Sequence, residues 1–264
     1  MNAMPAIAQT EAAEDLVALL ADASKTIDDI LAEARRRVRA RVVEGERVSG
    51  EKLEAEQHAA HGLAWLATYA QAIREMASYA ARLSGEGRFG ESEALVTRIA
   101  AGEYCAQVVG GIPMSQGETV RLSAFGLSAA DVAKLATPAL ETLIETGNTV
   151  ETRARLVRLI RESQGAVGDP GLDETLEAIR AEMARFSQAE VAPHAHEWHL
   201  QNAYIPYEVI GKMAELGVFG LTIPEEYGGL GLSKVSMCVV SEELSRGYIG
   251  VGSLGTRSEI AAEL

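Results

Sequence analysis

Apolar residues recur at intervals of three and four positions through most of this 264-residue chain. This periodicity is typical of amphipathic helices that bury one stripe, and strand-like alternation is almost absent. The first such stripe consists of Leu16, Leu19, Ala23, Ile27, Ile30 and Ala34. The pattern therefore predicts an all-α fold.

The spacing predicts further helices over residues 51–83, 91–109, 128–146 and 151–163. The stretch QGAVGDPG follows, and its combination of Gly, Pro and Asp is typical of a boundary between domains. We therefore expect a helical extension over residues 1–165, a linker over 166–171 and a second domain over 172–264.

The second domain opens on a stripe that runs from Leu172 to Phe186, and Pro193 is expected to close this helix. A short helix is predicted over residues 206–216, and the glycine-rich stretch GVFGLTIPEEYGGLGLS then predicts a tight, irregular passage. Helices resume at about Ser233 and again at about Ser253. No capping signal closes the last one, so we expect the sequence to be a fragment of a longer protein.

Composition excludes several classes of partner. Asp and Glu number 38 against 24 Lys and Arg, a net charge of -14 that opposes binding to a nucleic-acid backbone. The run of arginines from Arg35 to Arg41 is interpreted as a solvated helix end. Cys105 and Cys238 lie too far apart for a disulfide framework, and no apolar run is long enough to span a membrane. With no basic leader at the N-terminus, we expect a cytoplasmic protein.

Few residues could carry chemistry by themselves. The three histidines of the second domain, His194, His196 and His199, do not share one helical face, so no metal site is expected. His58 and His61 lack a nucleophile and are interpreted as a partly exposed helix face. Adjacent carboxylates diverge on a helix, so one of Glu242 and Glu243 should meet a cation and the other water. No catalytic residue is predicted in this chain.

One stretch carries a resemblance to a known family. The sequence IPYEVIGKMAELGVFGLTIPEEYGGLGLSKVSMCVVSEELSRGYIGVGS closely resembles the N-terminal helical domain of the FAD-dependent acyl-CoA dehydrogenases. The shared positions are Leu216, Gly217, Gly220, Ile223, Pro224, Glu225, Glu226, Tyr227, Gly228, Gly229, Gly231, Glu242, Glu243 and Leu244. Their glycines and proline are expected to shape a scaffold, with Ser233 capping the next helix.

The resemblance implies that the cofactor and the catalytic base are held by other domains of the protein. Members of this family place FAD between a middle β domain and a C-terminal helical domain, which also supplies the catalytic glutamate. These parts would lie beyond residue 264, so cofactor ligands cannot be assigned here and the chain alone should be inactive. The resemblance also implies an acyl-CoA substrate, an electron-transfer flavoprotein as partner and a homo-oligomer.

The family's N-terminal domain forms the far wall of the acyl pocket. This implies that Gly252, Ser253, Thr256, Arg257 and Ile260 lie near the acyl tail. In the glutaryl-CoA dehydrogenases an Arg and a Ser of this region hold a second carboxylate, but Ile249 stands at that arginine position here. We hypothesise that Arg257 takes this role, perhaps with Ser253 or Thr256; the alternative is an Arg257 exposed on its helix.

The first 165 residues are unusual for the family. Their stretches AAHGLAWLATYAQAIREM and GEYCAQVVGGIPMSQGE resemble the extension of the (2S)-methylsuccinyl-CoA dehydrogenases of the bacterial ethylmalonyl-CoA pathway. Residues 107–111, QVVGG, are similar to a flavin-binding motif of the family's C-terminal domain, although a helix end explains them equally well. A non-catalytic helical binding or oligomerisation module derived from the family is the competing hypothesis.

Overall fold

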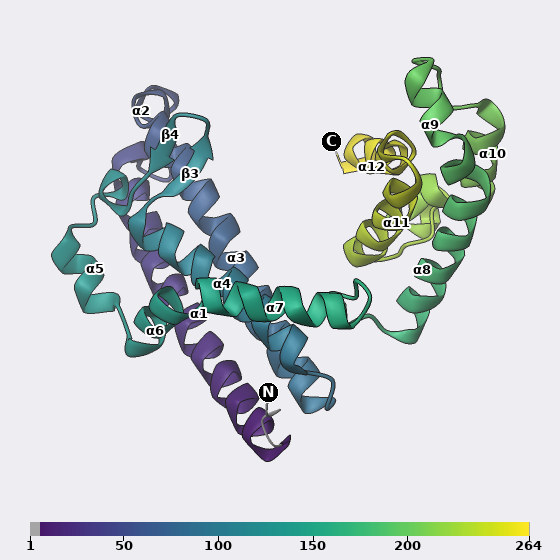
Figure 1. The fold of residues 1–264 in the computed structure, drawn as a ribbon. Coiled ribbons are helices and arrows are strands. Elements are labelled where there is room, and N and C mark those ends of the chain that lie inside the picture. The colour runs from purple at the N-terminus through teal and green to yellow at the C-terminus, as the bar shows by residue number, and fades with distance from the viewer. Residues whose placement is uncertain (1–5, 264) are drawn as a thin grey trace. The chain divides into compact units, whose positions relative to one another are not determined.

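The computed structural model describes the backbone of residues 6–263 and the surroundings of the side chains of residues 15–262. The chain divides into two compact units, Met1–Gly171 and Leu172–Leu264, which we call unit 1 and unit 2. Helices dominate both units, so the predicted all-α class is confirmed (Figure 1). The sequence pattern missed two short β-hairpins in unit 1.

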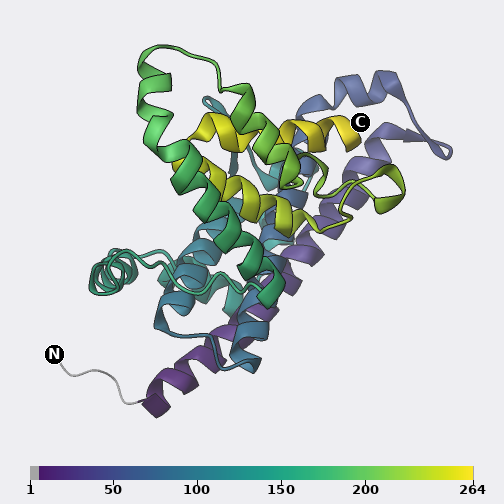
Figure 2. The same cartoon turned by 90° about the vertical axis from the view of Figure 1, so that its right-hand side faces the viewer.

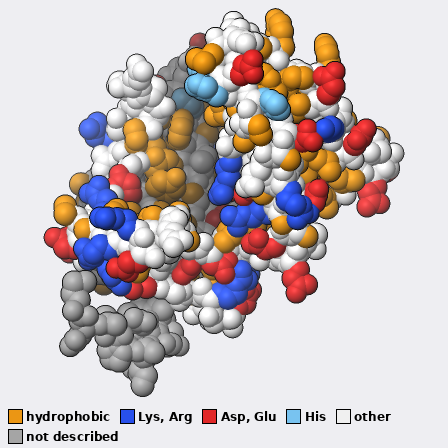
Figure 3. Space-filling model, turned by 45° about the vertical axis from the view of Figure 1, so that its right-hand side comes forward, with side chains coloured by type: hydrophobic (Ala, Val, Ile, Leu, Met, Phe, Trp, Pro, Cys, Tyr) orange, Lys and Arg blue, Asp and Glu red, His pale blue; other side chains and the backbone are white. Residues whose placement is uncertain are grey.

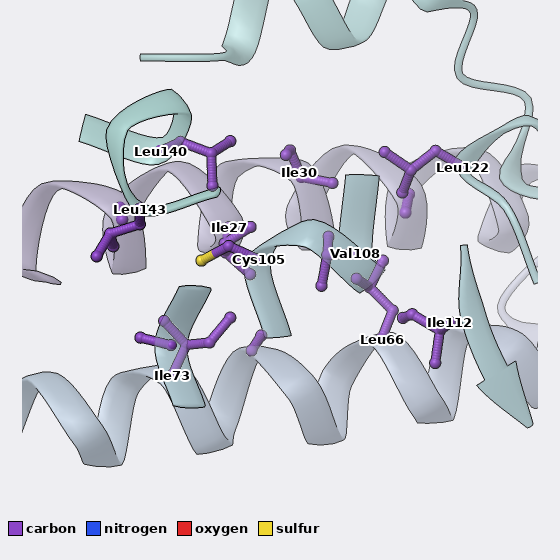
Figure 4. Close-up of a cluster of buried hydrophobic side chains, with 14 of the residues drawn as sticks. Ile27, Ile30, Leu66, Ile73, Cys105, Val108, Ile112, Leu122, Leu140 and Leu143 are labelled. Carbon is purple, nitrogen blue, oxygen red and sulfur yellow. The ribbon is translucent and has the colours of Figure 1, made fainter. Parts of the chain in front are cut away.

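Unit 1 is built around long helices that pack along one another. Its main helices are α1 (Ala6–Val42), α3 (Gln57–Gly85), α4 (Glu91–Gly110), α6 (Pro138–Thr146) and α7 (Val150–Glu162). Helix α4 contacts α1, α3, α6 and α7, which explains why its apolar residues are not confined to one face. The buried side chains of four helices meet in one core (Figure 4), namely Ile27, Ile30, Leu66, Ile73, Cys105, Val108, Leu140 and Leu143.

Smaller elements complete unit 1. Helices α2 (Gly50–Ala55) and α5 (Ala129–Leu135) and the 3-10 turn η1 (Leu122–Phe125) lie between the long helices in sequence. Strand β1 (Val43–Glu44) pairs with β2 (Arg47–Val48), and β3 (Ile112–Ser115) pairs with β4 (Glu118–Val120), both antiparallel. Ile112 lies opposite Val120, and both are buried in the core of unit 1.

Two predicted helices of unit 1 are interrupted. The one expected over residues 51–83 breaks at Glu56, between α2 and α3. The one expected over 128–146 breaks before Pro138, which begins α6 with Thr137 as its N-cap. Proline disfavours a helical conformation in the residue before it and lacks the N–H that a continuous helix would use. The prediction of a single helix over residues 128–146 was therefore wrong.

The arginines of α1 are only partly solvated. Arg35 and Arg39 are exposed, as predicted. Arg37 instead donates to the carbonyl oxygen of Gly126, and Arg41 donates to that of Ala124 at 2.9 Å. These two side chains therefore tie α1 to the η1 turn, and the solvated interpretation was wrong for them.

Residues 168–171 are held against unit 1. Arg88 donates two hydrogen bonds to the Asp169 carboxylate, at 2.7 and 2.8 Å. The backbone N–H of Asp169 donates to Glu93 at 2.6 Å, and the Tyr79 hydroxyl donates to the Asp169 carbonyl oxygen. Asp169 is therefore bonded to Tyr79, Arg88 and Glu93 of unit 1, although the composition around it is typical of a boundary between domains.

Unit 2 contains α8 (Glu174–Phe186), α9 (Ala192–Leu200), α10 (Tyr207–Glu215), α11 (Lys234–Gly247) and α12 (Ile249–Glu263). Short 3-10 turns, η3 (Val218–Gly220) and η4 (Glu225–Tyr227), lie between α10 and α11. Helix α11 packs against both α8 and α12 (Figure 2). The core consists of Met183, Phe186, Val191, Val209, Met213, Val218, Leu221, Val240, Leu244 and Val251.

Two helix boundaries in unit 2 differ from the prediction. Pro193 does not close the first helix, because the chain passes through a π-helical turn, η2 (Ser187–Val191), into α9. Proline is tolerated there because the first turn of a helix leaves its N–H groups unpaired. Helix α12 begins at Ile249, four residues before the predicted start at Ser253.

Candidate functional site

The residues predicted to lie near the acyl tail all fall on α12. Ser253, Thr256, Arg257 and Ile260 are spaced by three, one and three positions, so they share one face of this helix. Arg257 is exposed, Ile260 is 61% exposed, and Ser253 and Thr256 are half-buried. Ile249 lies on the same face and is 75% exposed. The structure therefore brings four of the five predicted residues into one surface, which we call the α12 face.

Gly252 is placed differently from the other four. It is buried against α11, where a Cβ atom would lie 2.8 Å from the Ser245 nitrogen and 2.9 Å from the Ser241 oxygen. Two helices approach this closely only where one of them lacks a side chain. Gly252 thus sets the distance between α11 and α12 behind the α12 face.

The hydroxyl groups of the α12 face bond to their own helix. Ser253 Oγ donates to the Gly250 carbonyl oxygen at 3.1 Å, and Thr256 Oγ1 donates to that of Ser253 at 2.9 Å. Each oxygen keeps lone pairs, and each hydroxyl can rotate toward a ligand. Among the described residues no carboxylate pairs with Arg257, so its guanidinium group is available to an anion.

The opposite face of α12 holds a buried carboxylate. Glu259 is 4% exposed and accepts hydrogen bonds from the backbone N–H of Thr222, at 3.2 Å, and from the Thr222 hydroxyl. Lys234 Nζ lies 3.5 Å from the same carboxylate. Sequence reasoning missed this cluster, because Thr222, Lys234 and Glu259 belong to three separate elements. It ties α12 to the start of α11 and to the glycine-rich passage.

The adjacent carboxylates of α11 differ in burial as predicted, but the expectation that only one of them meets a cation was wrong, because Arg246 lies 2.9 Å from Glu242 and 3.7 Å from Glu243. Glu243 is 4% exposed and lies 3.0 Å from Arg180 of α8, whereas Glu242 is exposed and pairs with Arg246. The hydrogen bond to Glu243 raises the pKa of the Arg180 guanidinium. The ion pair of Arg180 and Glu243 therefore joins α8 to α11. Glu242 and Glu243 point apart, so they are not placed to act together in acid–base chemistry on a substrate.

The glycine-rich passage is tight and irregular, as its composition predicted. Gly229 has no room for a side chain, because a Cβ atom would lie 2.0 Å from the Ile223 carbonyl oxygen. Backbone hydrogen bonds from Leu230 to Gly220 and from Leu232 to Leu221 fold the passage back on itself. Ser233 then accepts a hydrogen bond from the Ser236 N–H, which confirms it as the N-cap of α11.

The histidines do not gather into a site. His194, His196 and His199 are exposed on α9, and His194 stacks on Trp198 with ring centroids 5.7 Å apart. In unit 1, His58 lies 3.2 Å from Glu118, and His61 accepts a hydrogen bond from the Trp65 indole. Within the described side chains, no three His, Cys, Asp or Glu residues are arranged to hold a metal ion.

The QVVGG stretch forms the end of α4. Gly110 is the last residue of the helix, and Gly111 follows as the C-cap with a φ of 137°. The Gln107 side chain accepts a hydrogen bond from the Tyr69 hydroxyl and donates one to Glu103 at 2.6 Å. Both ends of the amide are thus occupied inside unit 1, which favours the structural interpretation of this motif.

Comparison with known proteins identifies unit 2. Residues 173–264 match the family described as acyl-CoA dehydrogenase, N-terminal domain. Residues 173–264 of the chain therefore carry the N-terminal helical domain of the acyl-CoA dehydrogenase family. None of the helices in the described part of the chain combines the length and apolarity needed to cross a bilayer.

One of the relatives also matches unit 1. The chain is 55% identical over 252 residues to (2S)-methylsuccinyl-CoA dehydrogenase of Cereibacter sphaeroides, a match that covers 95% of the chain. It is 40% identical over 82 residues to an isovaleryl-CoA dehydrogenase of Solanum tuberosum and 36% over 81 residues to a glutaryl-CoA dehydrogenase of Desulfococcus multivorans. Each of the latter matches covers 30% of the chain. The chain spans 45% of the Cereibacter protein and 20% and 21% of the other two.

One hollow in the described part of unit 2 does not fit the cofactor of this family. A shallow hollow of about 450 Å³ lies beside α8 and α10 in unit 2. In its lining Arg185 pairs with Glu182 and Lys212 pairs with Glu190, and Glu215 adds a further negative charge, so this hollow offers no unpaired cation to the pyrophosphate of FAD. No step of flavin chemistry is therefore assigned to the residues that line this hollow.

Proposed function

We propose that this chain is the N-terminal part of an FAD-dependent acyl-CoA dehydrogenase that acts on a short-chain dicarboxylic acyl-CoA such as methylsuccinyl-CoA. The reaction would remove hydrogen from Cα and Cβ of the acyl group, and bound FAD would accept the hydride. The main support is the 55% identity to a methylsuccinyl-CoA dehydrogenase over 252 residues, a length that must include most of unit 1. Relatives matched over only 30% of the chain act, by name, on other acyl groups.

In this proposal the α12 face contributes substrate binding only. Ile260 offers an apolar contact to the acyl chain, and Ser253 and Thr256 offer hydroxyl groups. Arg257 would pair with the second carboxylate of the substrate, because it is a permanent cation without a carboxylate partner among the described residues. Gly252 would hold the α12 face in place through its contact with α11. The FAD ligands and the catalytic base would come from parts of the protein outside these 264 residues.

The experiment is the Arg257→Met variant in the full-length product of the gene. Loss of a charge-assisted contact should raise KM for a dicarboxylic acyl-CoA by ~10- to 100-fold, with little change for a plain acyl-CoA of equal length. Arg246→Met is the matched control, because Arg246 is an exposed arginine of α11 that already pairs with Glu242. Equal effects of Arg257→Met on both substrates would contradict the role of Arg257.

The wider proposal includes an electron-transfer flavoprotein as the electron acceptor, a homo-oligomeric assembly and a cytoplasmic location. Two free cysteines in the folded chain are compatible with a reducing compartment. The competing proposal is a non-catalytic helical binding or oligomerisation module derived from the family. Visible flavin absorbance distinguishes the two: the full-length product should be yellow and this chain alone colourless. A colourless full-length product would favour the module.

A further inference from the structure

The second half of α12 carries Thr256, Arg257 and Ile260 of the α12 face, yet little of it is buried. Over residues 256–262, the range in which the side chains of this half are described, only Glu259 is buried, at 4% exposed. Arg257 and Ile260 are exposed, and so are the two alanines that follow. This half of the helix is therefore attached to the rest of unit 2 mainly through one carboxylate.

The first half of α12 gives its second half little support. It contains Gly250, Gly252 and Gly255 within six positions, and glycine disfavours the helical conformation. Gly255 lies against η3, where a Cβ atom would be 3.1 Å from a methyl group of Val218. These glycines allow close packing, but they do not make the helix stable by itself. The order of residues 256–262 thus depends on contacts made by their own side chains.

The carboxylate of Glu259 receives donors from two other elements. Thr222 donates through its backbone N–H, at 3.2 Å, and through its hydroxyl, and Lys234 Nζ of α11 lies 3.5 Å away. Backbone hydrogen bonds to the carbonyl oxygens of Leu221 and Ile223 fix the glycine-rich passage on both sides of Thr222. Glu259 therefore joins the second half of α12 to a part of unit 2 that is itself held in place. A buried carboxylate is stable only with donors of this kind.

The same contacts keep Glu259 away from Arg257. Residues two positions apart on a helix point about 200° apart, so the two side chains lie on opposite sides of α12. Elsewhere the basic side chains are intermixed with acidic ones, as Figure 3 shows. Arg257, by contrast, has no carboxylate partner among the described residues, in a chain whose net charge is -14. Its guanidinium group therefore stays available to a ligand.

We propose that Glu259 is a positioning residue for Arg257. Its carboxylate keeps residues 256–262 helical and thereby holds Arg257 on the α12 face. Without it this half of α12 would fray, and Arg257 would be in place for only part of the time. The KM of a substrate that Arg257 recognises would rise by the inverse of that fraction. Because Glu259 faces away from the α12 face, kcat would not change. This inference rests on the proposed role of the α12 face in binding a second carboxylate.

The test is the Glu259→Ala variant in the full-length product of the gene, with methylsuccinyl-CoA and butyryl-CoA as substrates. KM for methylsuccinyl-CoA should rise ~10-fold, and by no more than in Arg257→Met. KM for butyryl-CoA and both kcat values should change by less than about twofold. The matched control is Glu242→Ala, which removes an exposed carboxylate of α11 and should leave the kinetics unchanged.

A second variant and a double variant show whether Glu259 acts through Arg257. Thr222→Val removes one donor to Glu259 without altering α12, and it should raise KM for methylsuccinyl-CoA in the same direction by a smaller factor. Thr222→Val also carries the measurement if Glu259→Ala does not fold. In an Arg257→Met background, Glu259→Ala should not change the ratio of the two KM values further.

Hydrogen exchange of the full-length protein measures the order of α12 independently of activity. Peptides that cover residues 256–262 should exchange faster in Glu259→Ala than in the wild type, whereas peptides of α8 should be unaffected. Unchanged exchange, or an equal rise of both KM values, would overturn the proposal. A selective effect of Arg257→Met without one of Glu259→Ala would refute this inference alone. An Arg257→Met enzyme with unaltered substrate preference would refute the proposed role of Arg257, and this inference with it.

Discussion

The Gly252→Ala substitution tests whether the stability of unit 2 depends more on the close packing of α12 against α11 or on the helix preference of the residue at this position. A Cβ atom at this position would lie 1.9 Å from Ser245 Oγ, 2.8 Å from Ser245 N and 2.9 Å from Ser241 O. The Ser245 hydroxyl can rotate away. The two backbone atoms cannot move unless α11 and α12 separate, so the substitution must shift one helix relative to the other.

Two opposing terms determine the size of the effect. Alanine in place of glycine stabilises a helix interior by about 1 kcal/mol. Inserting a methyl group into a packed contact costs ~1–3 kcal/mol, and the upper end of this range applies because the atoms that must move belong to the backbone. The expected net result is a destabilisation of unit 2 by ~1–2 kcal/mol, which corresponds to a lower Tm by roughly 5–15 °C for a unit of this size.

The matched control is Gly211→Ala. Gly211 lies inside α10 of the same unit, and a Cβ atom there would have nothing within 4 Å. Only the helix preference remains, so this variant should be stabilised by ~0.5–1 kcal/mol. The two glycine-to-alanine changes should therefore have opposite effects on the free energy of unfolding of unit 2.

The two tryptophans provide the assay, because Trp65 lies in unit 1 and Trp198 in unit 2. In a Trp65→Phe background the fluorescence of Trp198 follows the unfolding of unit 2 alone in urea. Circular dichroism then shows whether unit 1 unfolds in the same transition. If Gly252→Ala stabilises unit 2 as much as Gly211→Ala does, the close contact between α11 and α12 is refuted.

Two other predictions concern titratable groups. The Arg88 guanidinium holds the pKa of the Asp169 carboxyl below its usual range, so the pair should stabilise unit 1 at neutral pH and lose this contribution as pH falls below about 4. Asp169→Asn should therefore cost ~1 kcal/mol at pH 7, measured by Trp65 fluorescence, and the difference from the wild type should shrink in acid; a difference that grows in acid would be contrary. Burial raises the pKa of the Cys105 thiol to about 12, whereas Cys238 is exposed. A thiol reagent at neutral pH should thus modify one thiol per folded chain and two after unfolding, and two rapid reactions in the folded chain would disagree with the burial of Cys105.

Much of the fold could be predicted because the spacing of apolar residues along a helix indicates which side of that helix is buried. The stripe from Leu16 to Ala34 is buried in the core of unit 1 apart from Leu19, which is partly buried against it. Ser233 caps α11 as its position before an apolar run indicated. These features depend on residues within two or three turns of one another, so sequence reasoning reached them without knowledge of the tertiary structure.

The missed features have other causes. The hairpin of β3 and β4 is short, and its buried positions Ile112, Met114 and Val120 are too few to show a period of two. The dipeptide Gln116–Gly117 between the strands was the available signal for a turn. Pro193 was interpreted as a helix end, because local rules do not foresee a π-helical turn that allows the chain to continue.

The candidate site shows how the two faces of α12 depend on each other. Gly252 packs directly against the backbone of α11, and the Glu259 carboxylate accepts a hydrogen bond from the Thr222 N–H. Helix α12 therefore cannot rotate about its axis without breaking a contact. A rotation by one residue, about 100°, would carry Arg257 away from the α12 face. The inward contacts therefore determine which side chains a substrate can meet. It follows that a change at Arg257 should alter ligand preference with little effect on stability, whereas a change at Gly252 should alter both.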